Sequence, residues 1–466
     1  MLLVCNYFCN FAHIFNIIKE KVMKHLRWII PLIVTVILVM NSACSPNHEL
    51  FDQEVTQAIS DSLSPVDSLD LHHNWVLTDT RNITVKANAN VNAQWLKILT
   101  ADPRKEANAE VATQVMIADG ETTIMSFCYP KTITTLYAAL IDDEGRFTVT
   151  DFSPNDTKVD FSEPLYTKQL ISYIPQPLTL VYCYEEEMPD YTNLDFDYND
   201  VVMGISYERT GEREIRFHVT LSAVGTDRPM SAALHLKNFK YDEIDTIYTE
   251  GGASFNVNSK GDEIPEQVIS PNLLRARELL LKSQSQDKEE DKEAVINLFC
   301  DAHWATGDFL QPNDQWLIDH YYYNVSKTSS SDMTYRIIVP KEVTYVVKFK
   351  EATGLEYLNF DLIDPFIIKE YLGGTFEVHP FAYRHDWVLK NYKLAEIVKL
   401  PWALAVPYKK YRHPLEGVNI GFKKKGIMGF GAYSKVSGHS FGEWSSNHNV
   451  ANDWYLNEYA TENQVY

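Results

Sequence analysis

The stretch "LDFDYNDVVM", residues 194–203, concentrates oxygen-bearing side chains directly before an apolar run. These side chains belong to Asp195, Asp197, Asn199 and Asp200. Carboxylates at this spacing repel one another, and their burial is unfavourable unless a partner or a metal ion compensates the charge. Three kinds of segment have this composition: a metal site, a catalytic site, and a solvated acidic loop that leads into a buried strand.

Calcium is the metal that these residue types favour, because it takes about six to eight hard oxygen ligands. In an extended strand, Asp195, Asp197 and Asn199 point to one face. The opposite face then carries Phe196, Tyr198 and Asp200. The stretch imitates the start of an EF-hand loop, but Asp200 stands where that loop needs glycine and Ser206 where it needs glutamate, so an EF-hand is excluded.

The apolar neighbours argue against the solvated acidic loop. Phe196, Tyr198 and the Val201-Val202 pair favour a buried backbone, which would bury the adjacent carboxylates with it. We therefore predict one structural calcium ion at this stretch. Its predicted ligands, including the acidic pair at the end of the preceding strand, are Glu185, Glu186, Asp195, Asp197, Asn199 and Asp200.

Most catalytic motifs are absent from the sequence. It contains no His-Glu-x-x-His helix and no phosphate-binding glycine loop, and its one Gly-x-Ser-x-Gly match, Gly438-His439-Ser440-Phe441-Gly442, is a five-residue pattern that does not by itself make a nucleophile elbow. We therefore expect no enzyme, and the alternative is a secreted, glycosidase-like hydrolase that uses the acidic cluster. His303, His379 and His385 are expected to be ordinary core or surface histidines. Four tryptophans suit either a sugar-stacking platform or a packed core: Trp387, Trp402, Trp444 and Trp454.

The beginning of the chain has the layout of a secretory signal. A short basic segment starts at Met23, an apolar run extends from Trp28 to Met40, and small residues lead to Cys44. The run is shorter than the roughly 20 residues of a membrane-spanning helix. The end of the run resembles a bacterial lipobox, which implies that Cys44 becomes the lipidated first residue. We predict that residues 1–44 are leader with the true start at Met23, and the alternative is an uncleaved membrane anchor.

The net charge and the spacing of the cysteines exclude two kinds of ligand. The formal net charge of −21 argues against nucleic acid, whose binding needs lysine and arginine opposite the phosphates. Cys128, Cys183 and Cys300 lack the paired spacing of a zinc site. We expect three thiols in the core, although one disulfide and one free thiol is an open alternative.

Composition divides the exported part into a tether and two domains. Residues 45–71 are polar and contain Ser-Pro, as expected for a flexible tether, and their Asp-Ser-Leu triplets make Ser62 and Ser68 candidates for O-glycosylation. Residues 72–160 alternate apolar and polar side chains in short runs, which predicts a small Ig-like β-sandwich. The turn "DDEGR", residues 142–146, fits a hairpin.

The segment "YEEEMPDYTNLDFDYNDVVM", residues 184–203, resembles the Phe-Glu-Asp-Leu-x-Pro and Asp-x-Asp-Phe-Asn-Asp-Val-Val motifs of LruC-domain lipoproteins, a largely uncharacterised family of bacterial envelope proteins. The similarity continues through "DPFII" and "FEVHP" and through the C-terminal region. There the matching residues include Pro401, Pro407, Pro414, Glu416, Tyr433, Trp444 and Trp454. The resemblance implies a jelly-roll-like β-sandwich over residues 161–466, on a lipoprotein at the cell surface. It implies no reaction.

An insertion interrupts this second domain at about residues 270–300. Leucines at helical spacing after Asn272 predict a short helix, and a solvated charge run follows from Asp287 to Glu293. Taken together, the sequence predicts an all-β, non-catalytic outer-membrane lipoprotein that acts as a surface binding or adhesion module. Its expected partners are the membrane, through the lipid, and a glycan or an envelope or host protein.

Overall fold

The computed structural model describes the greater part of the chain after residue 63. The described residues are 64–66, 68–87, 93–161, 169–170, 174–186, 195–257, 261, 263, 293–307, 321–329, 335–371, 374–380, 400–421, 431–434 and 439–466. They all belong to one compact unit, Leu63–Tyr466. Cys44, Ser62, the predicted helix after Asn272, His385 and Trp387 lie outside the described residues. Within these ranges, no helix is long and apolar enough to cross a membrane.

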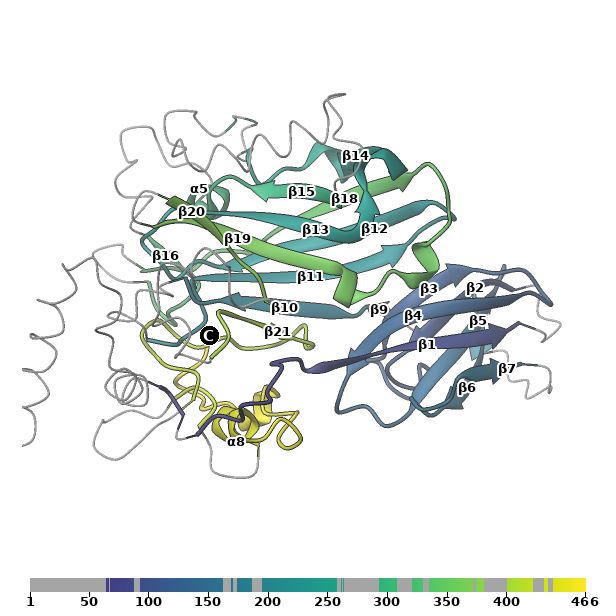
Figure 1. The fold of residues 1–466 in the computed structure, drawn as a ribbon, viewed down its shortest axis with the longest axis horizontal. Helices are drawn as coiled ribbons and strands as arrows, with labels where there is room; N and C mark the ends of the chain where they lie inside the picture. Colours follow the sequence, from purple (N-terminus) through teal and green to yellow (C-terminus); the bar gives the residue numbers. More distant parts are fainter. Residues whose placement is uncertain are drawn as a thin grey trace, which may run out of the picture. The chain divides into compact units, whose positions relative to one another are not determined.

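The N-terminal part of this unit is a small β-sandwich (Figure 1). One sheet has the order β4-β1-β7, formed by Thr122–Pro130, Thr78–Lys86 and Lys158–Asp160. The other has the order β8-β6-β5-β2-β3-β9, formed by Gln169–Leu170, Arg146–Phe152, Leu136–Asp142, Ala93–Leu99, Glu110–Met116 and Gln176–Pro177. Alternate residues such as Ile83, Val85, Leu96 and Ile98 are buried in one core, as the period-two pattern predicts.

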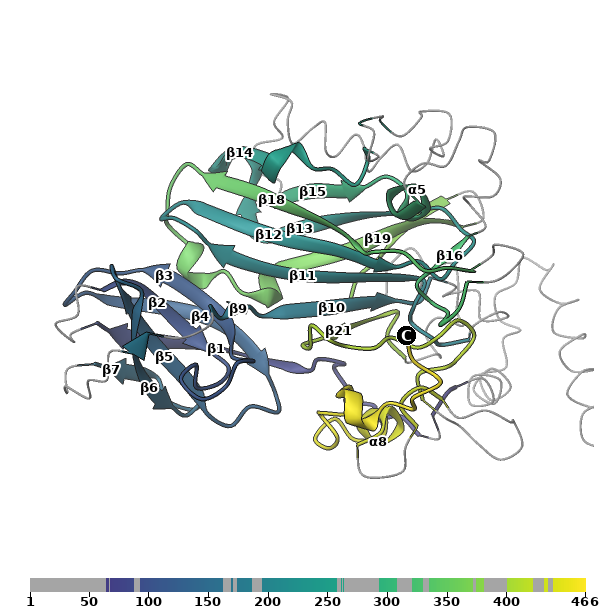
Figure 2. The same cartoon turned by 180° about the vertical axis from the view of Figure 1, so that it is seen from behind.

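The C-terminal part is a larger sandwich. Its six-stranded sheet has the order β14-β18-β12-β11-β10-β21, formed by Ile244–Thr249, Lys341–Phe349, Glu214–Ala223, Val201–Arg209, Thr179–Tyr184 and Ala403–Val406. Its four-stranded sheet has the order β15-β13-β19-β20, formed by Glu293–Phe299, Met230–Lys240, Ile363–Tyr371 and Gly374–Val378. The four-stranded sheet faces the viewer in Figure 1 and the six-stranded sheet in Figure 2. The prediction of an all-β sandwich fold is confirmed.

Short elements connect and flank these sheets. Tyr322–Tyr323 (β16) pairs in parallel with Tyr335–Arg336 (β17), and the described residues include the α-helices Ala302–Gly307 (α5) and Phe441–Ser446 (α8). Ser440 caps α8 in a capping box with Glu443, which fixes where this helix begins. Single 3₁₀ turns lie at Tyr241–Glu243, Glu250–Gly252, Leu355–Tyr357, Phe360–Leu362 and Asn457–Tyr459.

The end of the predicted insertion is a strand rather than a charged or helical segment. Glu293–Phe299 forms β15, which pairs antiparallel with β13. Ala294, Ile296 and Leu298 are buried, so the side chains follow the period of a strand. The sheet supplies a hydrogen-bonding partner for this backbone, and that long-range contact cannot be recognised from the local charge run.

The end of the predicted tether packs on the C-terminal region. Val66 is buried, and the Asp70 N–H donates to the Ser445 carbonyl over 2.8 Å. The ring of Trp75 meets that of Trp444 edge-on, with centroids 5.5 Å apart. The folded unit therefore starts several residues before the predicted boundary at residue 72. An isolated apolar side chain of this polar segment, Val66, packs into the core. Ser68 itself is exposed, so its hydroxyl is accessible to the glycosylation that the sequence predicts.

Two smaller predictions agree with the structure. β5 ends at Asp142 and β6 begins at Arg146, so "DDEGR" is a hairpin turn, and Gly145 takes a left-handed conformation with φ of 75°. Cys128, Cys183 and Cys300 are buried thiols outside any disulfide, which resolves the open alternative in favour of three core thiols.

Candidate metal centre

The acidic stretch is a tight loop that leads into β11, and the extended-strand interpretation of it is wrong. Phe196 and Tyr198 have φ of 56° and 52°, in the left-handed region that bulky residues rarely adopt. Tertiary contacts hold this conformation. The Ile420 N–H donates to the Phe196 carbonyl over 2.8 Å, and the Tyr198 hydroxyl donates to the Pro401 carbonyl over 2.7 Å.

Burial of the loop follows the prediction from its aromatic residues. Phe196 and Tyr198 lie in the core of the larger sandwich. Asp197 and Asp200 are only 1% and 6% exposed, while Asp195 is half-buried. The loop is therefore not a solvated acidic segment, and its carboxylates need compensation for the loss of water.

Three carboxylates converge in this loop. Glu185, directly after β10, offers one oxygen that lies with one oxygen each of Asp195 and Asp197 inside a group spanning at most 4.8 Å. Glu185 is fully buried, and its N–H donates to the Trp402 carbonyl on the neighbouring strand segment over 2.9 Å. The end of β10 and the loop before β11 thus bring together residues that are ten or more positions apart in the sequence.

Burial raises the pKa of each aspartate in the loop. For Asp197 the charges of Asp195, Glu416 and Glu185 add to the effect of burial, and its pKa lies well above the ordinary value. For Asp200 burial is again the largest cause, followed by the charges of Glu185 and Glu186. The common cause is that several negative charges are held close together away from water. A bound cation would lower these raised pKa values again.

Glu416 is a member of this cluster that the sequence prediction missed. It lies close enough to Asp197 to raise the pKa of that carboxyl, and the adjacent Gly417 N–H donates to Asp197 Oδ2 over 2.9 Å. More than 200 residues separate it from the acidic stretch, so local composition carries no signal of the contact. Its place among the residues that resemble the LruC family was the one available indication.

Glu186 has a different environment from Glu185. Its Oε2 lies 2.7 Å from Lys369 Nζ, and its Oε1 accepts from the Thr226 hydroxyl over 2.8 Å and lies 3.3 Å from Arg228 Nε. Lys369 and Glu186 are both fully buried, on opposite sheets of the sandwich. The structure therefore places Glu186 in an ion-pair network beside the cluster, contrary to its predicted role as a calcium ligand.

Asn199 and Asp200 connect chain segments around the cluster. Asn199 Nδ2 donates to the Pro414 carbonyl over 3.2 Å, and a Cβ at Gly225 would clash with Asn199 Oδ1. Asp200 Oδ2 accepts from the Glu186 N–H, and the Asp200 carbonyl accepts from Gly225. Of the six predicted ligands, Glu185, Asp195 and Asp197 form the convergent group, and Asp200 lies beside it.

The side chains of Glu185, Asp195 and Asp197 offer hard carboxylate oxygens, which suit a cation such as calcium. The nearby cations Lys369 and Arg228 contact Glu186, as described above. A divalent ion among Glu185, Asp195 and Asp197 would join the end of β10 to the loop before β11, with Glu416 and Gly417 on the adjoining C-terminal turn.

The predicted roles of two histidines can be compared with the structure. His303 is buried and its Nε2 lies 2.6 Å from the Thr226 carbonyl, as expected for a core histidine. His379 belongs to a charged ladder that crosses the four-stranded sheet. In this ladder Asp364 Oδ2 lies 3.0 Å from His379 Nδ1, 3.6 Å from His235 Nδ1 and 3.4 Å from Lys237 Nζ.

We expect this ladder to make stability depend on pH. Burial lowers the pKa of His379, but hydrogen bonds to Asp364 and Glu377 outweigh it and raise the pKa to about 9. An unfolded histidine titrates near 6.5, so the stabilisation is complete below about 6.5 and is lost as pH rises through about 9. Thermal unfolding between pH 6 and 10 should show this loss. His379→Gln should flatten it, and an unchanged profile in that variant would contradict the assignment.

Three of the four tryptophans considered in the sequence are core residues, and the fourth, Trp387, lies outside the described residues. Trp402, Trp444 and Trp454 are at most 1% exposed, and Trp444 and Trp454 pack with Phe441 in an aromatic cluster. Side chains buried to this extent cannot stack on a sugar, so the structure decides against the platform interpretation for these three residues.

Comparison with known proteins places the chain in no family. No protein-family model matches it, and no curated protein matches it. A crystal structure of a Bacteroides ovatus protein, described provisionally as a lipoprotein, is similar at 15% identity with a TM-score of 0.44, covering 79% of this chain and 99% of that one. Similarity at this level carries no argument about function, and the resemblance to LruC-domain lipoproteins stays a prediction.

Proposed function

We propose that the protein is a non-catalytic cell-envelope lipoprotein, anchored through Cys44, whose sandwiches form a surface binding or adhesion module stabilised by one calcium ion. The observation that carries the calcium part is the convergence of Glu185, Asp195 and Asp197 in a largely buried position. The signal-like N-terminus with Cys44 supports the anchor, and it supports an exported protein displayed at the outer membrane.

A structural ion explains why this cluster is tolerated. Buried carboxylates cost free energy unless a counter-charge or hydrogen bonds compensate them. Calcium accepts irregular oxygen cages, whereas magnesium demands near-octahedral geometry and keeps several waters. Backbone carbonyls and water would complete the coordination beyond Glu185, Asp195 and Asp197.

Hydrolysis is the weaker alternative for the same residues. Paired carboxylates at about 5 Å could act as the nucleophile and the acid of a retaining glycosidase. Such groups must reach a glycosidic bond, yet Glu185 and Asp197 are 0% and 1% exposed. Their burial in the core of the larger sandwich favours a structural role.

Lipidation tests the anchor. Expressed from Met23 in a Gram-negative host, the protein should incorporate a labelled fatty acid and partition into the detergent phase. Cys44→Ala should abolish both, because the proposed lipid is attached to that thiol. Cys128→Ala, which removes a buried thiol, is the matched control and should keep the label. Labelling that persists in Cys44→Ala would show that the anchor lies elsewhere.

A further inference from the structure

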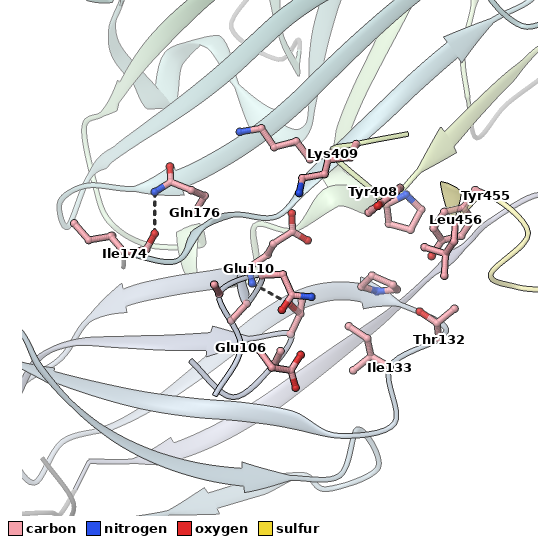
Figure 3. A pocket seen from close by; sticks show the side chains of 18 residues that line it. Glu106, Glu110, Thr132, Ile133, Ile174, Gln176, Tyr408, Lys409, Tyr455 and Leu456 are labelled. Atoms are coloured by element: carbon pink, nitrogen blue, oxygen red, sulfur yellow. Dashed lines mark hydrogen bonds between the residues drawn. The ribbon is translucent and has the colours of Figure 1, made fainter. Parts of the chain in front are cut away.

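A pocket with a volume of about 520 Å³ lies between the N-terminal sandwich and the C-terminal region (Figure 3). Glu106, Glu110, Thr132 and Ile133 line its lower wall in this view, and Lys409, Tyr408, Tyr455 and Leu456 line the upper wall. Pockets that bind small ligands commonly measure about 300–1,000 Å³. The cavity is therefore large enough for a ligand of two or three sugar rings.

Backbone pairing links the two walls, because β10, which follows Gln176 in the chain, pairs antiparallel with β21, and β21 ends two residues before Tyr408. Glu110 begins β3, which pairs in parallel with Gln176 of β9, and the Leu178 N–H donates to the Val111 carbonyl over 2.8 Å. The pocket is thus continuous with the sheet of the N-terminal sandwich and with the segment that enters β10. Its shape is preformed, which reduces the entropy lost on binding.

The charges that line the pocket balance. Glu106 and Glu110 face Lys409 and Lys410, so neither an anion nor a cation would meet a uniformly complementary wall. Burial raises the pKa of Glu110 to about 7, against the opposing effect of the two lysines. A neutral ligand rich in hydroxyl groups could use all of these side chains, since hydroxyls both donate and accept hydrogen bonds.

Apolar and aromatic side chains alternate with these polar groups. The ring of Tyr408 packs beside that of Tyr455, which is only 1% exposed, with centroids 6.3 Å apart, and Ile133, Pro407 and Leu456 also line the pocket. Ile174 at the same pocket is 75% exposed, which is unusual for so large an apolar side chain. Pyranose rings have apolar C–H faces and polar edges, and a surface of tyrosine, aliphatic and hydrogen-bonding groups matches both.

We infer that this pocket binds a neutral oligosaccharide. The inference rests on the proposed binding function, for which it supplies a location and a class of ligand. In this arrangement Tyr408 packs on a sugar face, while Glu110 and Lys409 hydrogen-bond hydroxyl groups at its edge. The predicted calcium cluster takes no part in this recognition.

Glycan binding by the exported chain, purified in calcium, tests this inference. An array of neutral and charged oligosaccharides would identify a ligand, and calorimetry would give its affinity for the variants. Tyr408→Ala should weaken binding of a neutral oligosaccharide by roughly tenfold or more, and Lys409→Ala, an exposed change that leaves the fold intact, should weaken it less. Tyr248→Ala removes an exposed tyrosine on β14, away from the pocket, and should have no effect.

The possible results distinguish an error in the location of the binding site from an error in the proposed glycan-binding function. If a neutral glycan binds equally well to wild type, Tyr408→Ala and Lys409→Ala, the protein is a glycan-binding module but this pocket is not its site. If only charged glycans bind, the inference about ligand class is wrong. If no glycan binds to the wild-type chain, both the inference and the glycan part of the proposed function fail.

Discussion

Lys369→Met is expected to lower the free energy of unfolding by about 3 kcal/mol, at the lower end of the values for breaking a buried ion pair. The ammonium of Lys369 and the carboxylate of Glu186 are fully buried and 2.7 Å apart. Removal of the lysine leaves a buried carboxylate whose remaining charged contact, Arg228, lies at 3.3 Å. The contact with Arg228 reduces the loss of stability. Chemical denaturation of the exported chain would measure the change in the free energy of unfolding.

An exposed ion pair provides the control. Lys348 and Glu214 lie 3.5 Å apart on the surface of the six-stranded sheet, with exposed side-chain fractions of 43% and 24%. Lys348→Met removes the same charge and leaves the same aliphatic stem, so it should cost at most about 1 kcal/mol. The double variant Lys369→Met, Glu186→Gln should regain part of the lost stability. Equal effects of the two lysine variants would contradict the burial of Lys369.

The position of Lys369 shows what the sequence could not predict. In "IIKEY" the lysine resembles a solvent-facing residue of an edge strand, the usual place for lysine in a sheet. Its burial depends on Glu186, which is 183 residues away and on the opposite sheet. The acidic pair Glu185-Glu186 was recognised as one feature, but the structure divides it between a cation network and the carboxylate cluster.

The strands were easier to predict than the loop that joins them. Period-two burial follows directly from the sequence in the buried parts of β1 and β2, and Gly145 marks its turn by residue type. By contrast, the alternating pattern of Asp195 to Asn199 imitates a strand, yet Phe196 and Tyr198 are left-handed. Contacts with Pro401 and Ile420, about 200 residues downstream, impose that conformation. No local pattern encodes them.

Glu416 illustrates the same limit for the candidate site. The density of carboxylates in residues 185–200 predicts where an ion would bind, because few other arrangements tolerate them. Glu416, on the other side of the cluster, comes from a separate turn. In that turn the Gly417 N–H donates a hydrogen bond to Asp197 Oδ2. Composition therefore predicts which residue types are candidate ligands, whereas which of these carboxylates converge depends on the tertiary fold.

Calcium is expected to raise the midpoint of thermal unfolding of the exported chain. Extracellular modules bind calcium with dissociation constants on the order of 10⁻⁴ to 10⁻³ M. An ion at about 100 times its dissociation constant adds about 2.7 kcal/mol to stability, provided that the unfolded chain does not bind it. The unfolded chain separates Glu185 from Asp197 and loses the convergent geometry. Magnesium should stabilise the chain less, because it needs a tighter, near-octahedral cage.

Two double variants make this prediction specific. Asp195→Asn with Asp197→Asn removes two charged donors of the convergent group and should abolish the dependence on calcium, while unfolding in EDTA should change much less. Asp242→Asn with Asp245→Asn removes the same charge from exposed positions beside and on β14, so the response to calcium should persist. A midpoint that is the same in EDTA and in millimolar calcium, or that rises equally in both double variants, would leave the cluster as buried, protonated carboxyls without an ion.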